Sequence, residues 1–171
     1  MKSTLLSVTK YGLLMGIGFC LYTTIMWLSK LDTTYLYIGQ YLDMAIIILP
    51  IIIISKSINE KNKQISVNFW ERTAIAVYVG LISYAIYQPF LYSYHHYINP
   101  NWFDAVLSLK KSSLIATKMS SIEISQILNK MTENNLAQDK MFSFSSFISS
   151  VIILPFFISL LSLLFIRKTS K

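Results

Sequence analysis

The stretch YLYIGQYLDMAIIILPIIII, residues 35–54, decides the fold class of this chain. Its length matches the about 20 residues that a helix needs to cross the hydrocarbon layer of a membrane. Asp43 is the one charged residue within it. Lipid offers no hydrogen bonds to the backbone, so a segment of this kind must bond its own N–H and C=O groups. The stretch therefore predicts a membrane-spanning helix.

Three further apolar blocks, residues 11–28, 73–94 and 147–166, contain no charged side chain. All three are close to the spanning length, and they lack the period-2 alternation of a membrane barrel. Of the 171 residues, 54% are hydrophobic and 13% are charged, about half the charged fraction usual in soluble domains. We therefore predict an all-α fold, an integral membrane four-helix bundle that forms a single domain over residues 1–171.

The segment between the third and fourth spans has its own helical signals. Asn99 followed by Pro100 is typical of a helix cap with proline at the first position. Ser120 and Glu123 have the spacing of a capping box, and apolar residues then recur at helical period. These signals predict a short helical hairpin over residues 99–135. It could be a docking surface for a partner, or it could lie on the membrane or cap the bundle.

Asn68 and Glu71 have the same capping-box spacing just before the third span. We expect them to start that helix at the membrane interface. Pro50, Pro89 and Pro155 each fall within a span, and they predict local kinks there.

Lys and Arg in the short flanks predict the orientation of the spans. Three of the flanks are basic and must share one side, which we interpret as cytoplasmic: Lys2 and Lys10; Lys56, Lys61, Lys63 and Arg72; and Arg167, Lys168 and Lys171. Both termini are then cytoplasmic and the hairpin is extracytoplasmic. Topology and anionic lipid headgroups account for the net charge of +7, so we expect the lipid bilayer and no nucleic acid as a partner.

Polar residues within the spans are the candidate functional residues. Asp43 lies near the middle of the second span, where a carboxylate is costly and is by default a functional hypothesis. Counting along antiparallel helices predicts an intramembrane polar layer in the extracytoplasmic half, formed by Thr23, Thr24, Gln40, Asp43 and Gln88. This layer could be a proton- or cation-linked site, or a hydrogen-bonded clamp between helices.

Small residues predict where helices pack closely. Gly12 and Gly16 form a GxxxG pair in the first span, and Ala76 and Gly80 begin a similar stripe in the third. We expect these faces to pack within the bundle. His95 and His96 have no further ligands at metal-site spacing, so we expect no bound metal and no cofactor.

Several features resemble a known family. They are Lys10-Tyr11-Gly12 with Gly16, the entry to the third span from Ile65-Ser66 to Phe69, its Tyr-rich exit, Asn99-Pro100 before Trp102-Phe103, and Ser120-Ser121-Ile122-Glu123. Their order and spacing over nearly the whole chain are similar to the domain of unknown function 4199 family, small four-span proteins found mainly in Bacteroidetes. The resemblance implies a bacterial inner-membrane location. It implies no activity and no catalytic residues.

Three functional hypotheses follow from the residues. The first is a non-enzymatic multi-pass protein that acts by association with itself, as a homo-oligomer, or with a membrane protein partner. The second is a small transporter or ion- or proton-coupled protein that uses Asp43. The third is a membrane enzyme, for which no nucleophile, base and orienting group can be assembled from motif spacing, and we therefore expect no catalytic residues.

Overall fold

The computed structural model describes residues 2–64, 66–138 and 142–165, and these residues form helices joined by short turns, with no strand among them. In chain order the elements are α1 (Lys2–Leu28), α2 (Leu36–Ala45), α3 (Ile48–Gln64), α4 (Phe69–Ser93), the π-helical turn η1 (Tyr94–Ile98), α5 (Trp102–Ala116), α6 (Ser121–Gln138), α7 (Phe144–Phe147), the π-helical turn η2 (Ile148–Ile153) and α8 (Leu154–Phe165).

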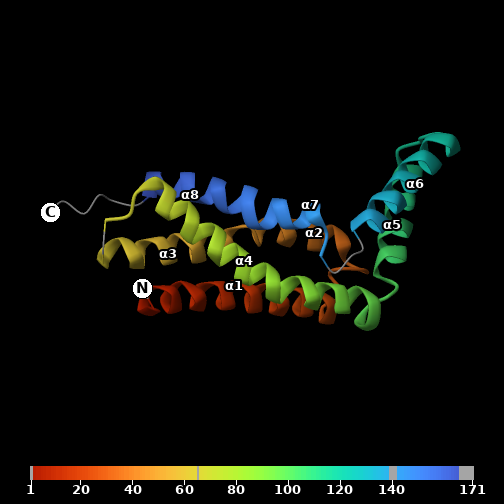
Figure 1. Ribbon diagram of the computed structural model, residues 1–171. Helices are drawn as coiled ribbons and strands as arrows, with labels where there is room; N and C mark the ends of the chain where they lie inside the picture. The colour runs from red at the N-terminus through yellow and green to blue at the C-terminus, as the bar shows by residue number, and fades with distance from the viewer. Residues whose placement is uncertain (1, 65, 139–141, 166–171) are drawn as a thin grey trace.

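The long helices lie side by side in one elongated bundle (Figure 1). The start of α1, the connection from α3 to α4 and the end of α8 lie at the same end, which we call the terminal end. The paired helices α5 and α6 project from the opposite end, which we call the hairpin end. The predicted helical hairpin is therefore present, and it stands away from the bundle at this end.

Four helical stretches are long and apolar enough to cross a membrane: Val8–Leu28, Leu36–Lys63, Phe69–Ile98 and Phe144–Leu161. Large apolar side chains cover their outward faces, among them Leu14, Leu21, Met44 and Phe157. Water would penalise so large an apolar surface, whereas lipid tails solvate it. The protein is therefore an all-α bundle of membrane-spanning helices, as the sequence predicts.

The tightest core of the bundle lies toward the terminal end. Its buried side chains come from α1, α3, α4 and α8 and are Val8, Met15, Ile53, Ile54, Ile58, Ala76, Val79 and Ile158. Helix α2 contributes none of them and packs only sparsely on the other helices. At the hairpin end, buried Met26 and Tyr94 lie alongside polar contacts that include Asp32.

Prolines interrupt two of the predicted spans. The second span divides into α2 and α3 at Ile46 and Ile47, just before Pro50. Pro50 has no N–H to donate to the carbonyl of Ile46, and its ring crowds that carbonyl. In the fourth span, the π-helical turn η2 immediately precedes α8, the helix that contains Pro155. Kinks in helices are often found at π-helical turns and at prolines. Pro89 lies inside α4.

Two capping boxes start helices as the sequence predicts. The Asn68 side chain accepts a hydrogen bond from the N–H of Glu71, and the Glu71 carboxylate accepts one from the N–H of Asn68, both 2.9 Å long. At the start of α6 the Glu123 carboxylate accepts hydrogen bonds from the hydroxyl and the N–H of Ser120. These hydrogen bonds from Ser120, first from its side chain and then from its backbone, lower the pKa of Glu123.

The predicted cap at Asn99 is wrong. Helix α5 begins at Trp102, after Asn101, and the side chain of Asn101 makes no capping hydrogen bond. Asn99 instead ends η1, and its side chain bonds to Asp32 and Tyr94. A strong hydrogen bond to a buried carboxylate has displaced the local capping interaction that the spacing suggested.

Candidate functional site

Asp32, in the turn between α1 and α2, is a buried acid at the hairpin end. Only 9% of the residue is exposed. Its Oδ2 atom accepts hydrogen bonds from the Tyr94 hydroxyl and, at 2.9 Å, from the Asn99 amide nitrogen. The same Asn99 nitrogen donates to the Tyr94 hydroxyl oxygen at 2.9 Å. The other carboxylate oxygen, Oδ1, is buried and has no hydrogen-bond partner among the described residues.

The backbone around Asp32 brings this acid back onto the bundle. Lys30 adopts a left-handed conformation with φ of 56° and ends α1. The N–H of Lys30 bonds to the carbonyl of Trp27, and the N–H of Leu31 bonds to that of Met26, both at 2.9 Å. This pair of bonds is the Schellman pattern, which reverses the chain after a helix. Asp32 follows directly, so the reversal brings its side chain to the end of the bundle.

The π-helical turn η1 supplies the partners of Asp32. The Asn99 N–H bonds to the carbonyl of Tyr94 at 2.8 Å, which is the i to i−5 spacing of a π-helical turn. This spacing brings residues five apart onto one face. The side chains of Tyr94 and Asn99 therefore reach the same carboxylate.

Asp43, on α2, is the second carboxylate of the site. Its Oδ1 atom accepts a hydrogen bond of 2.8 Å from the Tyr22 hydroxyl on α1. The side chain is exposed at the surface of the bundle. Within a span, this surface faces lipid, where an ionised carboxylate loses its hydration. The hydrogen bond from Tyr22 stabilises the carboxylate, but one neutral donor does not offset that loss.

Both carboxylates border one cavity of about 160 Å³ between α1, α2 and the end of α4. The Thr23 hydroxyl and the Tyr87 hydroxyl, 3.1 Å apart, lie on its wall. His95 also borders it and stacks on Trp102, with ring centroids 4.6 Å apart. No Lys or Arg is among the described side chains that line this space. We call it the acidic cavity.

The structure brings together only part of the predicted polar layer. Thr23 and Asp43 both border the acidic cavity. Thr24 donates a hydrogen bond of 2.8 Å to the carbonyl of Cys20 in its own helix. Gln40 is exposed and lines a different groove, and Gln88 is buried on α4 outside the cavity lining.

The glycines of the first span lie against α4. A Cβ atom at Gly12 would lie 2.6 Å from the Cβ of Ile82, and one at Gly16 would lie 3.0 Å from the Cβ of Ile86. Ala76 is fully buried, and Gly80 faces the fourth span, where Pro155 would lie 2.9 Å from an added Cβ. Small residues therefore occupy contacts between spans one and three and between spans three and four.

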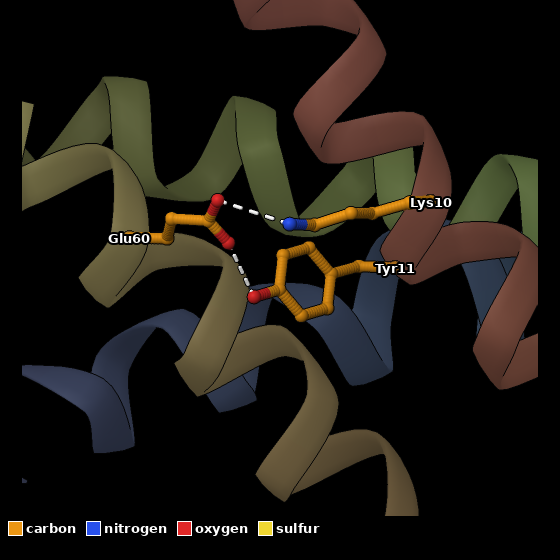
Figure 2. Close-up of polar contacts among 3 residues, drawn as sticks. All are labelled: Lys10, Tyr11 and Glu60. Carbon is orange, nitrogen blue, oxygen red and sulfur yellow. Dashed lines mark hydrogen bonds and ion pairs between the residues drawn. The ribbon is translucent and has the colours of Figure 1, made fainter.

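A second polar cluster lies near the terminal end (Figure 2). Lys10 forms an ion pair of 3.0 Å with Glu60, and the Tyr11 hydroxyl donates to the other oxygen of the same carboxylate. The Lys10 ammonium also lies 4.9 Å from the centre of the Tyr11 ring. The cluster joins α1 to α3, and it is separate from the acidic cavity.

Sequence reasoning missed three of these residues. Asp32 lies in a short turn, where an acid is ordinary, and only the chain reversal and η1 make it buried. Tyr22 resembles the many other tyrosines of the spans. Glu60 could have been predicted from the sequence. It follows the second span, whereas Lys10 precedes the first, so the two opposite charges fall at the same end of neighbouring antiparallel helices.

The chemistry available at these sites is that of oxygen ligands and protons. Among the described residues, no group of three or more His, Cys, Asp or Glu side chains is placed to hold a metal ion. The acidic cavity offers two carboxylates, several hydroxyls and one imidazole. These groups can bind or transfer a proton, or can coordinate a small hard cation.

Comparisons with known proteins give a family and no activity. No curated protein and no solved structure matches the chain. One family model, described as "Protein of unknown function (DUF4199)", matches residues 10–168. That range includes all but the first two residues of the four spans, together with the acidic cavity and the terminal-end cluster. The chain therefore belongs to the DUF4199 family.

Proposed function

We propose that this protein is a multi-pass membrane protein whose conformation is coupled to a proton or a small cation bound in the acidic cavity. The observation that carries the proposal is the unpartnered Oδ1 atom of Asp32, buried beside a cavity that Asp43 also borders. An oxygen in this position needs a proton, a cation or an ordered water to satisfy it.

The charge balance of the cavity supports the proposal. Two ionised carboxylates that border one cavity repel each other, and burial further penalises the charge of Asp32. Since no Lys or Arg is among the described residues that line the cavity, these residues supply no permanent positive charge there. Uptake of a proton or a cation lowers this electrostatic cost and favours the packed position of α2 against α1.

The other titratable groups that face the cavity are Tyr22, Tyr87, Tyr94 and His95. The tyrosines ordinarily stay neutral below about pH 10, so they act as hydrogen-bond donors in the physiological range. A protonated imidazole at His95 would itself offset one carboxylate. A test of the proposal must therefore separate the acids from this histidine.

The experiment follows intrinsic Trp and Tyr fluorescence of the purified protein in nanodiscs against pH and sodium concentration. The wild type is expected to respond, and Asp32→Asn and Asp43→Asn are each expected to weaken that response. His95→Gln is the control for the imidazole. A response that persists in both Asp variants and vanishes in His95→Gln would assign the titration to the histidine and overturn the proposal.

The proposed location is the bacterial inner membrane with both termini cytoplasmic, and the proposed role is non-enzymatic. The clustering of Lys and Arg in the flanks at the terminal end supports this orientation, because positive flanks stay on the cytoplasmic side. The hairpin end and the acidic cavity would then face the extracytoplasmic side.

A second candidate function, association with another copy or with a membrane partner, is favoured by the exposed face of α2. The Tyr41 hydroxyl donates to the Tyr37 hydroxyl at 2.9 Å on a surface that would otherwise meet lipid. Polar groups in spans commonly bond across helix interfaces. In a Cys20→Ala background, a Tyr41→Cys variant should cross-link between copies in native membranes, whereas Leu21→Cys on α1 should not. Equal cross-linking at both positions would contradict an interface at α2.

A further inference from the structure

A second hollow, separate from the acidic cavity, lies between α2 and the projecting hairpin. This groove has a volume of about 710 Å³, within the range of about 300–1,000 Å³ typical of small-molecule sites. One wall is the preceding turn and α2, the other is α5, and Met131 of α6 also contributes. We call it the hairpin groove.

The hairpin groove is lined mainly by apolar and aromatic side chains, together with a few polar ones and one lysine. Leu36 and Ile38 from α2 face Val106 and Leu109 from α5. The one charged side chain that lines the groove is that of Lys110, and no Asp or Glu is among its described lining residues. The groove therefore suits a ligand with an apolar body and a negative head.

The position of the groove further limits the chemical class of ligand that it could bind. Helix α2 belongs to a candidate membrane span, whereas α5 and α6 lie outside the spans. Tyr35 and Tyr37 line the groove where the span ends, and tyrosine favours the headgroup level of a bilayer. The hollow thus lies between the end of a candidate span and a helix outside the spans that carries Lys110.

We propose that the hairpin groove binds an anionic phospholipid of the leaflet at the hairpin end. One acyl chain lies between Leu36 and Val106, and the anionic headgroup is paired with Lys110. The bound lipid fills the space between α2 and α5, and so it holds the hairpin in its position beside the span. This inference does not depend on the proposed role of the acidic cavity.

The test uses the full-length protein in nanodiscs that contain mixtures of phosphatidylglycerol and phosphatidylcholine, followed by native mass spectrometry of the lipids retained. Lys110→Gln removes the charge at the groove. Lys111→Gln is the matched control, because Lys111 is the next residue, is exposed and does not line the groove. Retained phosphatidylglycerol is expected to fall about fivefold in Lys110→Gln, the effect of one lysine near an anionic surface, and to stay unchanged in Lys111→Gln.

Val106→Trp is a second variant that fills the apolar part of the groove without changing its charge. It should also lower lipid retention while the circular dichroism spectrum stays that of the wild type. Equal losses in Lys110→Gln and Lys111→Gln would indicate general surface attraction and would overturn the site. Equal retention of the two lipids, or displacement of the bound lipid by glycerol phosphate that lacks acyl chains, would overturn it as well.

Discussion

The hydroxyl of Tyr22 on α1 donates a hydrogen bond of 2.8 Å to the carboxylate of Asp43 on α2. Helix α2 packs only sparsely on the rest of the bundle, so this bond is one of the specific contacts that hold it against α1. Tyr22 and Asp43 also line the cavity that Asp32 borders. The same contact thus serves both the stability of α2 and the electrostatics of the site.

Tyr22→Phe should loosen α2 while the rest of the bundle stays intact. Loss of the hydrogen bond is expected to lower the free energy of unfolding by about 0.6 kcal/mol, the average found for interhelical hydrogen bonds in a membrane bundle. Hydrogen exchange of the α2 amides should become faster. Tyr41→Phe makes the same chemical change on the exposed face of α2, and it should have a smaller effect on both quantities. Equal effects of the two variants would contradict the role assigned to Tyr22.

Gly12→Ala should destabilise the contact between α1 and α4. The added Cβ atom would lie 2.6 Å from the Cβ of Ile82 and 3.1 Å from the carbonyl oxygen of Val79, so one of the helices must shift. Overpacking of this kind typically costs about 1–3 kcal/mol.

Gly18→Ala is the matched control for that prediction. Its nearest atom would be Cδ2 of Leu49 at 3.1 Å, the far end of a flexible side chain that can move aside. Thermal unfolding in detergent should show a clear fall of the midpoint for Gly12→Ala and little change for Gly18→Ala. The same midpoint in both variants would rule out the close α1–α4 contact at Gly12.

Glu60→Ala should weaken the cluster that joins α1 to α3 near the terminal end. The variant loses both the ion pair with Lys10 and the hydrogen bond from Tyr11, whereas Glu60→Gln can still accept the bond from Tyr11. Thermal stability should therefore fall more in Glu60→Ala than in Glu60→Gln. The ion pair is partly exposed, so added salt should reduce the difference between the wild type and Glu60→Gln. A difference that is independent of salt would argue against a contribution from the ion pair.

Much of the fold could be predicted from the sequence because lipid restricts the choices severely. An apolar block such as residues 73–94 can only be a helix across a membrane, and Asn68 with Glu71 marks where that helix begins. The break at Pro50 and the widened turn before Pro155 were harder to place, since a proline can kink, break or end a helix according to its neighbours.

The candidate site was less predictable than the fold. Counting residues from the ends of the spans identified Asp43 and Thr23 as polar residues of similar depth. Such a count does not give the rotation of each helix about its axis. Gln40 and Gln88 were therefore predicted in the same polar layer as Asp43, but neither borders its cavity. Asp32 depends on a chain reversal at Lys30 and on a π-helical turn, and neither of these has a distinctive signal in a single sequence.

The orientation in the membrane is predicted from the basic flanks. A reporter that is active only in the cytoplasm should work when fused after Lys171 or inserted near Lys61, and it should fail near Ser125 in α6. The Lys and Arg residues at the terminal end are the physical reason, because they resist translocation. Activity near Ser125 together with inactivity near Lys61 would reverse the assigned orientation.

The most direct test of the account is infrared difference spectroscopy of the protein in nanodiscs, recorded between high and low pH at low and at high sodium. The C=O stretch of a protonated carboxyl group reports directly whether a buried acid has taken up a proton. We predict a carboxylic acid band in the wild type at low pH, a loss of that band as pH or sodium rises, and a reduced band in Asp32→Asn. A wild-type spectrum identical at every pH and sodium concentration to that of the Asp32→Asn, Asp43→Asn double variant would contradict a proton- or cation-coupled acidic cavity.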